Sequence, residues 1–278
     1  MRKISIFPLA ALLLGSCNFN VPANVSNAIV QTVSTIINEQ PASTGEVTDG
    51  LMELPAIESD DIILTHKGFT LSYNSSARIP EWVAYELTAD ETRGEADRDD
   101  AMFQMDPSYR STQAMREDYT GSGWTKGHMA CAADFHWDEE AMDETFYLTN
   151  ICPQSEKLNA GDWEFLERRV RAWARDYGKV WIVAGPIIGN NSYGTIGRRT
   201  EVTVPDAFFK AVMAYDGMKY ISVAFVMGND DERYYLRDCA MSVDELEKMT
   251  GYDLFASLDD DIEDVAESTW EGAPWGIR

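Results

Sequence analysis

The sequence predicts an α+β fold in which a central, mainly antiparallel sheet is flanked by helices. Several short segments alternate apolar and polar residues or are continuously apolar, and both patterns are typical of strands. These segments are grouped along the chain with few helices between them, which argues against a doubly wound parallel sheet. One long helical pattern and one shorter capped helix supply the flanking layers.

Six segments are expected to form strands. Gly68–Asn74 and Glu81–Thr88 alternate and are aromatic, which is typical of a hairpin or meander. Lys179–Ile188 is a mostly apolar run, typical of a buried strand, and a glycine follows it. The last two strands are joined through an Asp-Gly turn. In chain order the expected strands are 68–74, 81–88, 146–151, 179–188, 208–215 and 219–229.

Two helices have recognisable ends. Leu158–Gly178 repeats apolar residues at helical spacing and closes with a glycine. Ser242–Gly251 begins with a serine at the cap, carries Glu245 at the third helical position and ends in glycine. This pattern predicts a capping box at the start of the second helix and a glycine stop at its end.

The N-terminus has the features of an export signal. Two basic residues follow Met1, and Ile4–Leu14 is apolar but too short to span a bilayer as a mature helix. The sequence Leu13–Cys17 resembles the lipobox of bacterial lipoproteins, which implies a signal peptide over residues 1–16 and a lipid on Cys17. The alternative is a simple secretory signal in which Cys17 is incidental.

The segment after this signal is expected to be a tether. Residues 17–61 are rich in Asn, Ser, Thr, Pro and Ala, and only Asn27–Ile37 has the spacing of a short helix. We expect one domain over residues 62–278. In the lipoprotein interpretation the protein is exported, faces the periplasm or the cell surface, and contacts the membrane through its N-terminal lipid alone.

The charge distribution restricts the possible ligands. The formal net charge of the 278 residues is -24, which repels nucleic acid and anionic membranes at long range. Any phosphate-binding function therefore needs a local basic patch. Glu156–Arg199 holds eight basic and five acidic residues, whereas Asp230–Arg278 holds four basic and fifteen acidic ones. The acidity is thus concentrated in the last fifty residues and spares the long helix.

The remaining cysteines do not indicate a structural zinc site. Cys131, Cys152 and Cys239 form neither a Cys-x-x-Cys motif nor a cluster with histidine. An exported protein can form disulfides, and a bridge between Cys131 and Cys152 is one possibility. Two independent buried thiols are equally compatible with the sequence.

One histidine and one helix carry the residues that suggest chemistry. His128 lies in a stretch of small residues, and the long helix carries Asn159, Trp163, Glu167 and Arg171 at intervals of four. Four residues advance an α-helix by about 400°, so this series stays on one side of the helix. An amide, a carboxylate and a guanidinium facing a histidine suit metal-assisted phosphodiester chemistry. The alternative is a structural histidine and a solvated helix face.

The motifs around these residues resemble a known family. "GWTKGHMACAAD" and "ETFYLTNICPQSEKLNAGDWEFLE" are similar to the DNA/RNA non-specific endonucleases with a ββα-metal site. In that family the pattern is Asp-Arg-Gly-His-x-Ala-Pro-Ala, a strand ending in Ser-Asn with Pro-Gln behind it, and then Asn, Trp and Glu on a helix. Here Thr125-Lys126 replaces Asp-Arg, and Cys131 replaces the proline. Lys126 keeps the positive charge but loses the bidentate fork of arginine.

The resemblance implies a role for each matching residue. His128 is expected to be the general base, and Asn159 the direct protein ligand of Mg²⁺, for which Mn²⁺ is a possible substitute. Glu167 is expected to hold metal-bound water. The other expected site residues are Lys126 and Arg171 on phosphate oxygens, Asn150 fixing the histidine's loop, and an arginine within 93–98 adding a phosphate contact.

The predicted function is therefore an exported, Mg²⁺-dependent endonuclease that cuts DNA and RNA by contacting their backbone. Two alternatives are a catalytically weak or inert binding lipoprotein on the same fold and a phosphodiesterase acting on small nucleotides. Four further residues are expected to have no catalytic role: His136 and Gln154 are structural, Trp163 packs in the core, and His66 has no partner.

Overall fold

The computed structural model describes residues 51–278. The predicted signal peptide, the lipidation site Cys17, the helix expected at 27–37 and the first part of the tether lie outside the described residues. Met52 is fully buried, and the backbone N–H of Ala56 donates to the carbonyl of Asp253 at 2.8 Å. The folded unit therefore includes residues ahead of Ile62, where the sequence pattern placed its start.

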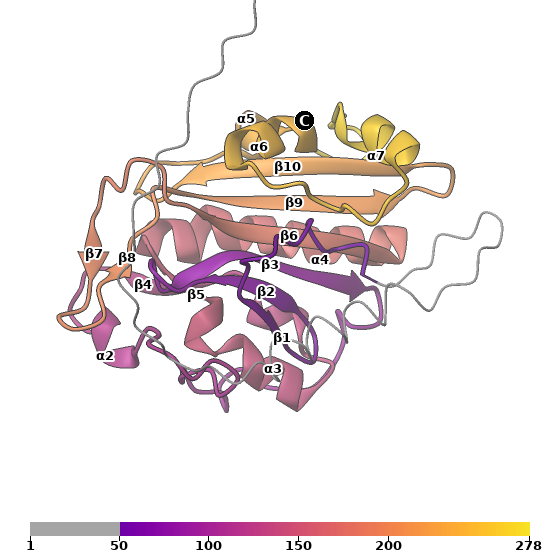
Figure 1. Cartoon of the computed structure of the whole chain (residues 1–278). Coiled ribbons are helices and arrows are strands. Elements are labelled where there is room, and N and C mark those ends of the chain that lie inside the picture. Colours follow the sequence, from indigo (N-terminus) through magenta and orange to yellow (C-terminus); the bar gives the residue numbers. More distant parts are fainter. Residues whose placement is uncertain (1–50) are drawn as a thin grey trace, which may run out of the picture. The chain divides into compact units, whose positions relative to one another are not determined.

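A seven-stranded sheet forms the centre of this unit and confirms the predicted α+β class (Figure 1). Its strand order is β1-β2-β3-β6-β9-β10-β11, and each neighbouring pair is antiparallel. The strands are β1 (Ile63–Thr65), β2 (Thr70–Asn74), β3 (Ile79–Thr88), β6 (Lys179–Ile187), β9 (Ala207–Tyr215), β10 (Tyr220–Gly228) and β11 (Ala240–Met241).

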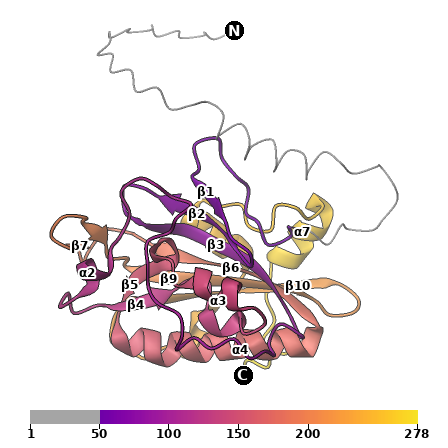
Figure 2. The ribbon, with the colours of Figure 1, turned by 90° about the horizontal axis from the view of Figure 1, so that it is seen from below.

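The two faces of the sheet bury two separate hydrophobic clusters. In β6, Ile182 joins one cluster while its neighbours Trp181 and Val183 join the other, as strand alternation requires. The long helix α4 (Trp163–Tyr177) covers the first face (Figures 1 and 2). Helices α6 (Val243–Thr250) and α7 (Asp260–Glu267) cover the second.

The remaining elements lie between or beside these layers. Strands β4 (Thr125–His128) and β5 (Ile151–Gln154) pair with each other, as do β7 (Thr195–Ile196) and β8 (Val202–Thr203). Between β4 and β5 run the 3₁₀ turns η1 (Ala132–Asp134) and η2 (Leu148–Asn150), with helix α3 (Glu139–Thr145) between them. The short helices α2 (Arg116–Tyr119) and α5 (Leu236–Cys239) and the π-helical turn η3 (Leu158–Asp162) complete the order.

Two predicted elements differ from the structure. The strand expected at 146–151 is wrong, because Leu148–Asn150 forms η2 and the strand begins only at Ile151. The helix expected from Leu158 begins as the π-helical turn η3 and becomes α-helical at Trp163. The predicted capping box is confirmed, since the Ser242 Oγ accepts from the Glu245 N–H at 3.2 Å and Gly251 ends α6 at φ 81°.

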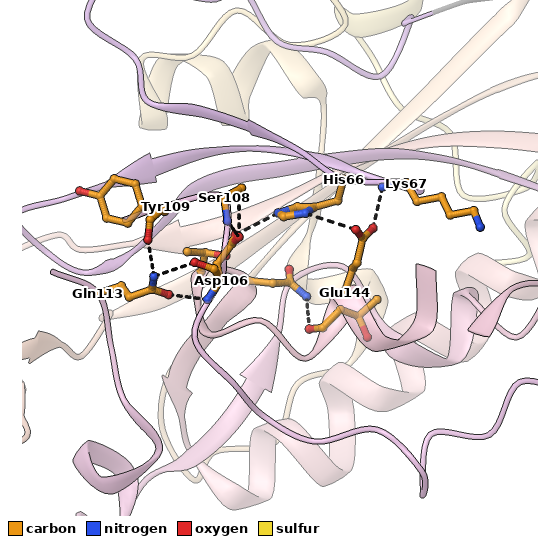
Figure 3. A network of polar contacts seen from close by, with 10 residues as sticks. His66, Lys67, Asp106, Ser108, Tyr109, Gln113 and Glu144 are labelled. Atoms are coloured by element: carbon orange, nitrogen blue, oxygen red, sulfur yellow. Dashed lines mark hydrogen bonds and ion pairs between the residues drawn. The ribbon is translucent and has the colours of Figure 1, made fainter. Parts of the chain in front are cut away.

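A buried polar network anchors the long loop between β3 and α2 (Figure 3). The Asp106 carboxylate accepts from the Thr149 hydroxyl at 2.6 Å, and its Oδ2 lies 3.1 Å from Nε2 of His66. The Gln113 side chain bonds both backbone groups of Asp106. The expectation that His66 has no partner is therefore wrong, because Asp106, which is distant in sequence, folds against it.

The network also fixes the charge of Asp106. Burial raises the pKa of this carboxyl, but hydrogen bonds from His66, Ser108 and Thr149 outweigh burial and lower the pKa to about 2. The loop that Asp106 holds also carries Phe103, which lines the cavity described below. Within residues 51–278, no helix combines the length and apolar character needed to cross a bilayer.

We expect Asp106→Asn to destabilise the protein by about 2 kcal/mol or more, because an amide cannot accept from three donors in this buried position. Urea unfolding at neutral pH measures the change. Asp143→Asn, an exposed carboxylate on α3, is the matched control and should change stability by less than about 0.5 kcal/mol. Equal effects of the two substitutions would contradict the importance of the network.

Candidate nuclease site

The pairing of β4 with β5 places His128 at the end of β4, opposite Ile151. This pairing requires a glycine at position 127, because a Cβ there would lie 2.1 Å from Oε1 of Gln154. Gln154 is fully buried and ends β5, where it faces Thr125 across the pair. Gln154 was expected to support the turn after Pro153, and in the structure its side chain packs against Gly127.

The imidazole of His128 packs against two aromatic rings that also contact each other. Its centroid is 5.4 Å from that of Phe103 and 4.8 Å from that of Phe146. The residue is half-buried, but its Nε2 is shielded from solvent and has no hydrogen-bond partner among the described residues. Burial, with a smaller contribution from the charge of Arg98, lowers the pKa of His128 to about 3. The ring is therefore neutral, and able to accept a proton, at neutral pH.

Asn150 holds the chain that follows His128. Its Oδ1 accepts from the Ala130 N–H at 2.8 Å, and its Nδ2 donates to the carbonyls of Ala130 at 3.1 Å and Thr145 at 2.8 Å. The Met129 N–H donates to the Asn150 carbonyl at 3.1 Å. The geometry agrees with the predicted positioning role, because one buried side chain joins the end of α3 to the loop after β4.

Asn159 lies in the π-helical turn and connects it to β4. Its Nδ2 donates to the Thr125 hydroxyl at 3.0 Å and to the Lys126 carbonyl at 3.4 Å. The Thr125 hydroxyl also donates to the Gln154 carbonyl at 2.8 Å. Threonine at this position therefore joins β5 to the helix through hydrogen bonds, and neither bond of Asn159 uses its Oδ1.

A cavity of about 400 Å³ brings four predicted site residues together. These are His128 and Lys126 from β4, Asn159 from η3, and Glu167 from α4. The full lining is Arg98, Phe103, Thr125, Lys126, His128, Cys131, Ala132, Asn159, Glu164 and Glu167. Of the segment 93–98, Arg98 reaches the cavity, whereas Arg93 lies 3.7 Å from Asp90 in an exposed ion pair.

Glu167 is buried at the inner end of the site. Burial raises the pKa of its carboxyl, and the charge of Asp134 adds to this rise. The charges of Lys210 and Arg171 and a hydrogen bond with Cys131 oppose it. Lys210 is fully buried on β9, with its Nζ 4.8 Å from the Trp163 ring centroid. Lys210 was not among the predicted site residues, although a charged residue within an apolar strand was the available signal.

Arg171 is placed beside the cavity and does not line it. Its Nη1 donates to Oδ1 of Asp134 at 2.7 Å and lies 3.3 Å from Sγ of Cys131. Asp134 also accepts from the Tyr85 hydroxyl at 2.7 Å. The structure therefore does not bring the Arg171 guanidinium to the place expected for a phosphate. The Arg171 side chain instead connects α4 to the turn that carries Cys131.

Lys126 projects a cation into the cavity without an anionic partner among the described residues. Its Nζ lies 5.2 Å from the ring centroids of both Phe103 and Tyr119. Burial, with a smaller contribution from Arg116, lowers the pKa of Lys126. Since no carboxylate neutralises it, this ammonium is available to an anionic ligand.

The other predictions near the site concern structural residues. Cys131 and Cys152 are separate buried thiols, so no disulfide connects them. His136 contacts the Ala96 carbonyl through Nδ1 at 2.6 Å, and Trp163 is buried in the core. The structural roles expected for His136 and Trp163 are confirmed.

The oxygen donors at the cavity suit a hard divalent cation. Oδ1 of Asn159 and the carboxylate of Glu167 are the ligand types that Mg²⁺ and Mn²⁺ accept. His128 lies in the same lining, and its Nε2 has no hydrogen-bond partner among the described residues. The donor set therefore fits a metal-assisted site.

The sequence profile described as DNA/RNA non-specific endonuclease matches residues 52–261. The chain belongs to this family. The mitochondrial nuclease EXOG of Mus musculus is 38% identical over 205 residues, covering 68% of this chain and 55% of its own length. The mitochondrial endonuclease G of Homo sapiens is 32% identical, covering 67% of each chain. The chain thus spans little more than half the length of the mouse relative.

A fungal relative and a solved structure agree with this membership. Nuclease C1 of Cunninghamella echinulata var. echinulata is 33% identical over 213 residues, covering 70% of this chain and 83% of its own. A chain in the crystal structure of the EndoG/EndoGI complex superposes with a TM-score of 0.69 at 26% identity. That match covers 80% of this chain and 96% of the other, so the two share the fold of nearly the whole described unit.

The pKa of His128 predicts how stability depends on pH. The unfolded chain binds a proton at this histidine near pH 6.5, whereas the folded chain does so only near pH 3. Acidification between these values therefore favours unfolding. Between pH 7.5 and 5, the wild type should lose on the order of 2 kcal/mol more stability than His128→Gln, as measured by urea unfolding. An equal loss of stability in the two proteins would show that the pKa of His128 is the same in the folded and the unfolded chain.

Proposed function

We propose that this protein is a divalent-metal-dependent endonuclease that hydrolyses phosphodiester bonds of DNA and RNA with little sequence preference. The observation that carries the proposal is the convergence of His128, Asn159, Glu167 and Lys126 on one cavity. These residues come from a strand, a π-helical turn and a helix that other contacts hold together. Membership of the nuclease family and relatives named as nucleases support the same activity.

In this proposal His128 is the general base. Its ring is neutral at neutral pH, because burial disfavours the charged form. In the substrate complex its Nε2, which has no hydrogen-bond partner among the described residues, would accept the proton of the water molecule that attacks phosphorus. The rings of Phe103 and Phe146 restrict the imidazole plane. Asn150 acts as a positioning residue by holding the chain that follows.

Asn159 would hold a divalent ion through Oδ1, and Glu167 would orient its water ligands. When bound, the ion supplies positive charge that offsets the charge developing on the phosphate and the leaving oxygen. We propose Mg²⁺, with Mn²⁺ as a substitute, because the donors are oxygen atoms. The hydrogen bonds from Asn159 to β4 keep the amide oriented in the absence of ligand.

Lys126 and Arg98 are the cations proposed to contact phosphate oxygens. Lys126 has no anionic partner and lies over two aromatic rings, so its ammonium is held at the cavity wall. Arg98 stands exposed at the cavity. Arg171 is proposed as a positioning residue, because its ion pair with Asp134 fixes the turn carrying Cys131, and Cys131 in turn bonds Glu167.

A second depression supports a polymeric substrate over a small nucleotide. It has a volume of about 660 Å³ and shares Glu164 with the proposed active site. Five arginines line it, against two carboxylates, in a chain whose formal net charge is -24. The arginines are Arg168, Arg169, Arg233, Arg237 and Arg278. A local excess of positive charge beside the cavity would hold a neighbouring stretch of nucleic-acid backbone.

We propose that the enzyme is exported as a bacterial lipoprotein. The support is the sequence pattern of a basic start, a short apolar run and the segment that ends at Cys17. Cleavage after residue 16 would leave a lipid on Cys17 as the only membrane contact, with the nuclease unit facing the periplasm or the outside.

We expect nicking of supercoiled plasmid and cleavage of RNA in Mg²⁺, with both reactions abolished by EDTA. His128→Ala and Asn159→Ala should each lower the cleavage rate at least about a hundredfold, since each removes a group that contacts the reacting atoms or their cation. Gel assays of initial rate measure this, and Asn190→Ala, at an exposed loop asparagine, is the matched control.

The same assay separates the alternatives. Wild-type protein that leaves both polymers intact but hydrolyses an aryl phosphodiester would be a small-substrate phosphodiesterase. Protein inert toward all three substrates would be a binding lipoprotein, in which the change to Thr125-Lys126 has removed activity.

We expect Arg237→Glu to weaken binding of long DNA and leave cleavage of a short oligonucleotide unchanged. Reversing a charge in the arginine-lined depression removes a backbone contact distant from the scissile bond. The apparent KM for plasmid should rise about tenfold, and the salt dependence of binding should become shallower by about one unit of log-log slope. Arg175→Glu, exposed on α4 outside this depression, is the matched control. Equal effects of both variants would indicate only a general charge effect.

A further inference from the structure

Three carboxylates come together on the face of the sheet opposite to α4. Asp244 and Glu247 lie three residues apart on α6, and Glu267 is the last residue of α7. One oxygen of each carboxylate lies within 4.8 Å of one oxygen of the other two. This acidic cluster is independent of the proposed active site, which is built on β4, η3 and α4.

Glu267 points into this cluster from a buried position. The residue is 2% exposed, and its Oε1 is shielded from solvent with no hydrogen-bond partner among the described residues. A buried carboxylate oxygen that lacks a partner costs several kilocalories per mole unless it is neutralised. Asp244 and Glu247 are half-buried, which leaves the cluster open to solvent on their side.

The surrounding charges do not neutralise the cluster. Nζ of Lys248 lies 3.4 Å from Oδ2 of Asp244 in an exposed ion pair. Among the groups whose charges most affect the pKa of Glu247, Lys248 is the one cation. Burial, with Glu247, Glu263 and Asp244, raises the pKa of Glu267 to about 9. A bound cation would offset the mutual repulsion of the three carboxylates.

Apolar packing holds the three side chains together despite their repulsion. Val243 and Leu246 of α6 and Ala266 of α7 are buried in the hydrophobic cluster on this face of the sheet. The Ser222 hydroxyl on β10 donates to the Ala266 carbonyl at 2.8 Å, which fixes the end of α7. The carboxylates are thus brought together by packing that does not depend on their own attraction.

We propose that Asp244, Glu247 and Glu267 form a Ca²⁺-binding site that joins α6 to α7. Calcium takes oxygen ligands at about 2.3–2.6 Å, so two ligands of one ion are at most about 5 Å apart, and the three oxygens here lie within 4.8 Å of one another. Mg²⁺ demands near-octahedral geometry and usually keeps several waters, so a site made of three protein carboxylates suits Ca²⁺ better. Glu247 already accepts the Leu254 N–H through Oε1 at 2.7 Å, and its Oε2 remains for a cation.

This site would stabilise the helical layer on the second face. It takes no part in the proposed hydrolysis, and its existence does not depend on the nuclease assignment. A bound ion would link the start of α6 to the end of α7, two helices that otherwise share mainly apolar contacts with the sheet.

The test is the thermal unfolding of the full chain, stripped with EDTA and then titrated with CaCl₂. We expect Ca²⁺ to raise the Tm of the wild type by about 5 °C. Asn159→Ala removes the proposed nuclease-site ligand and should keep the whole rise. Asp261→Asn, an exposed carboxylate on α7, should also keep it.

Glu267→Gln should abolish the Ca²⁺-dependent rise, because it removes the buried ligand carboxylate. Glu247→Gln, at a half-buried position, provides a second test and should at least halve the rise. Isothermal titration should show one Ca²⁺ bound at this cluster in the wild type and in Asn159→Ala. The same titration of Glu267→Gln should lack this ion. The proposal would be overturned if Ca²⁺ did not raise the Tm of the wild type. It would also be overturned if Ca²⁺ raised the Tm of both Glu→Gln variants as much as that of the wild type.

Discussion

The proposed active site depends on the antiparallel pairing of β4 with β5. This pair is short and lies apart from the large sheet, so side-chain amides connect it to its surroundings. Asn150 bonds it to the end of α3, and Asn159 bonds it to the start of the long helix. Because these amides are uncharged, the framework around His128 is insensitive to salt and to the large negative charge of the chain.

The sheet separates two local charge clusters. The arginine-lined depression lies beside α4, and the acidic cluster of α6 and α7 lies on the opposite face of the sheet. The apolar layers between them have a low dielectric and contain few charges. A polyanion would therefore be attracted locally at the depression. The net charge alone would suggest repulsion from every direction.

The sequence predicted five of the seven strands of the sheet, because these strands alternate or form buried apolar runs, and it missed the short edge strands β1 and β11. It also located His128, Lys126, Asn159 and Glu167, which the fold brings to one cavity. The segment 146–151 misled because its aromatic and apolar residues are typical of a strand, although Leu148–Asn150 forms a 3₁₀ turn that buries them. Local pattern does not distinguish these two ways of burying the same side chains.

Three other differences between expectation and structure have a non-local cause. His66 meets Asp106, and Arg171 meets Asp134, across long separations in sequence. Helical spacing placed Arg171 correctly on its helix but carried no information about Asp134, the carboxylate with which Arg171 forms an ion pair. Lys210 is buried by the register of β9, which depends on strand pairing and not on its neighbours in the chain.

The π-helical turn that carries Asn159 has a consequence for how this helix can vary. The Trp163 N–H bonds to the Leu158 carbonyl, and this ring encloses one residue more than an α-helical ring. The turn therefore acts as a one-residue insertion stored inside a continuous helix. Deleting that residue would relax the turn into ordinary α-helix and rotate the preceding segment by about 100° relative to Glu167. The extra residue thus allows Asn159 and Glu167, on one helix, to line the same cavity. Shortening the helix here would separate these two side chains without removing either.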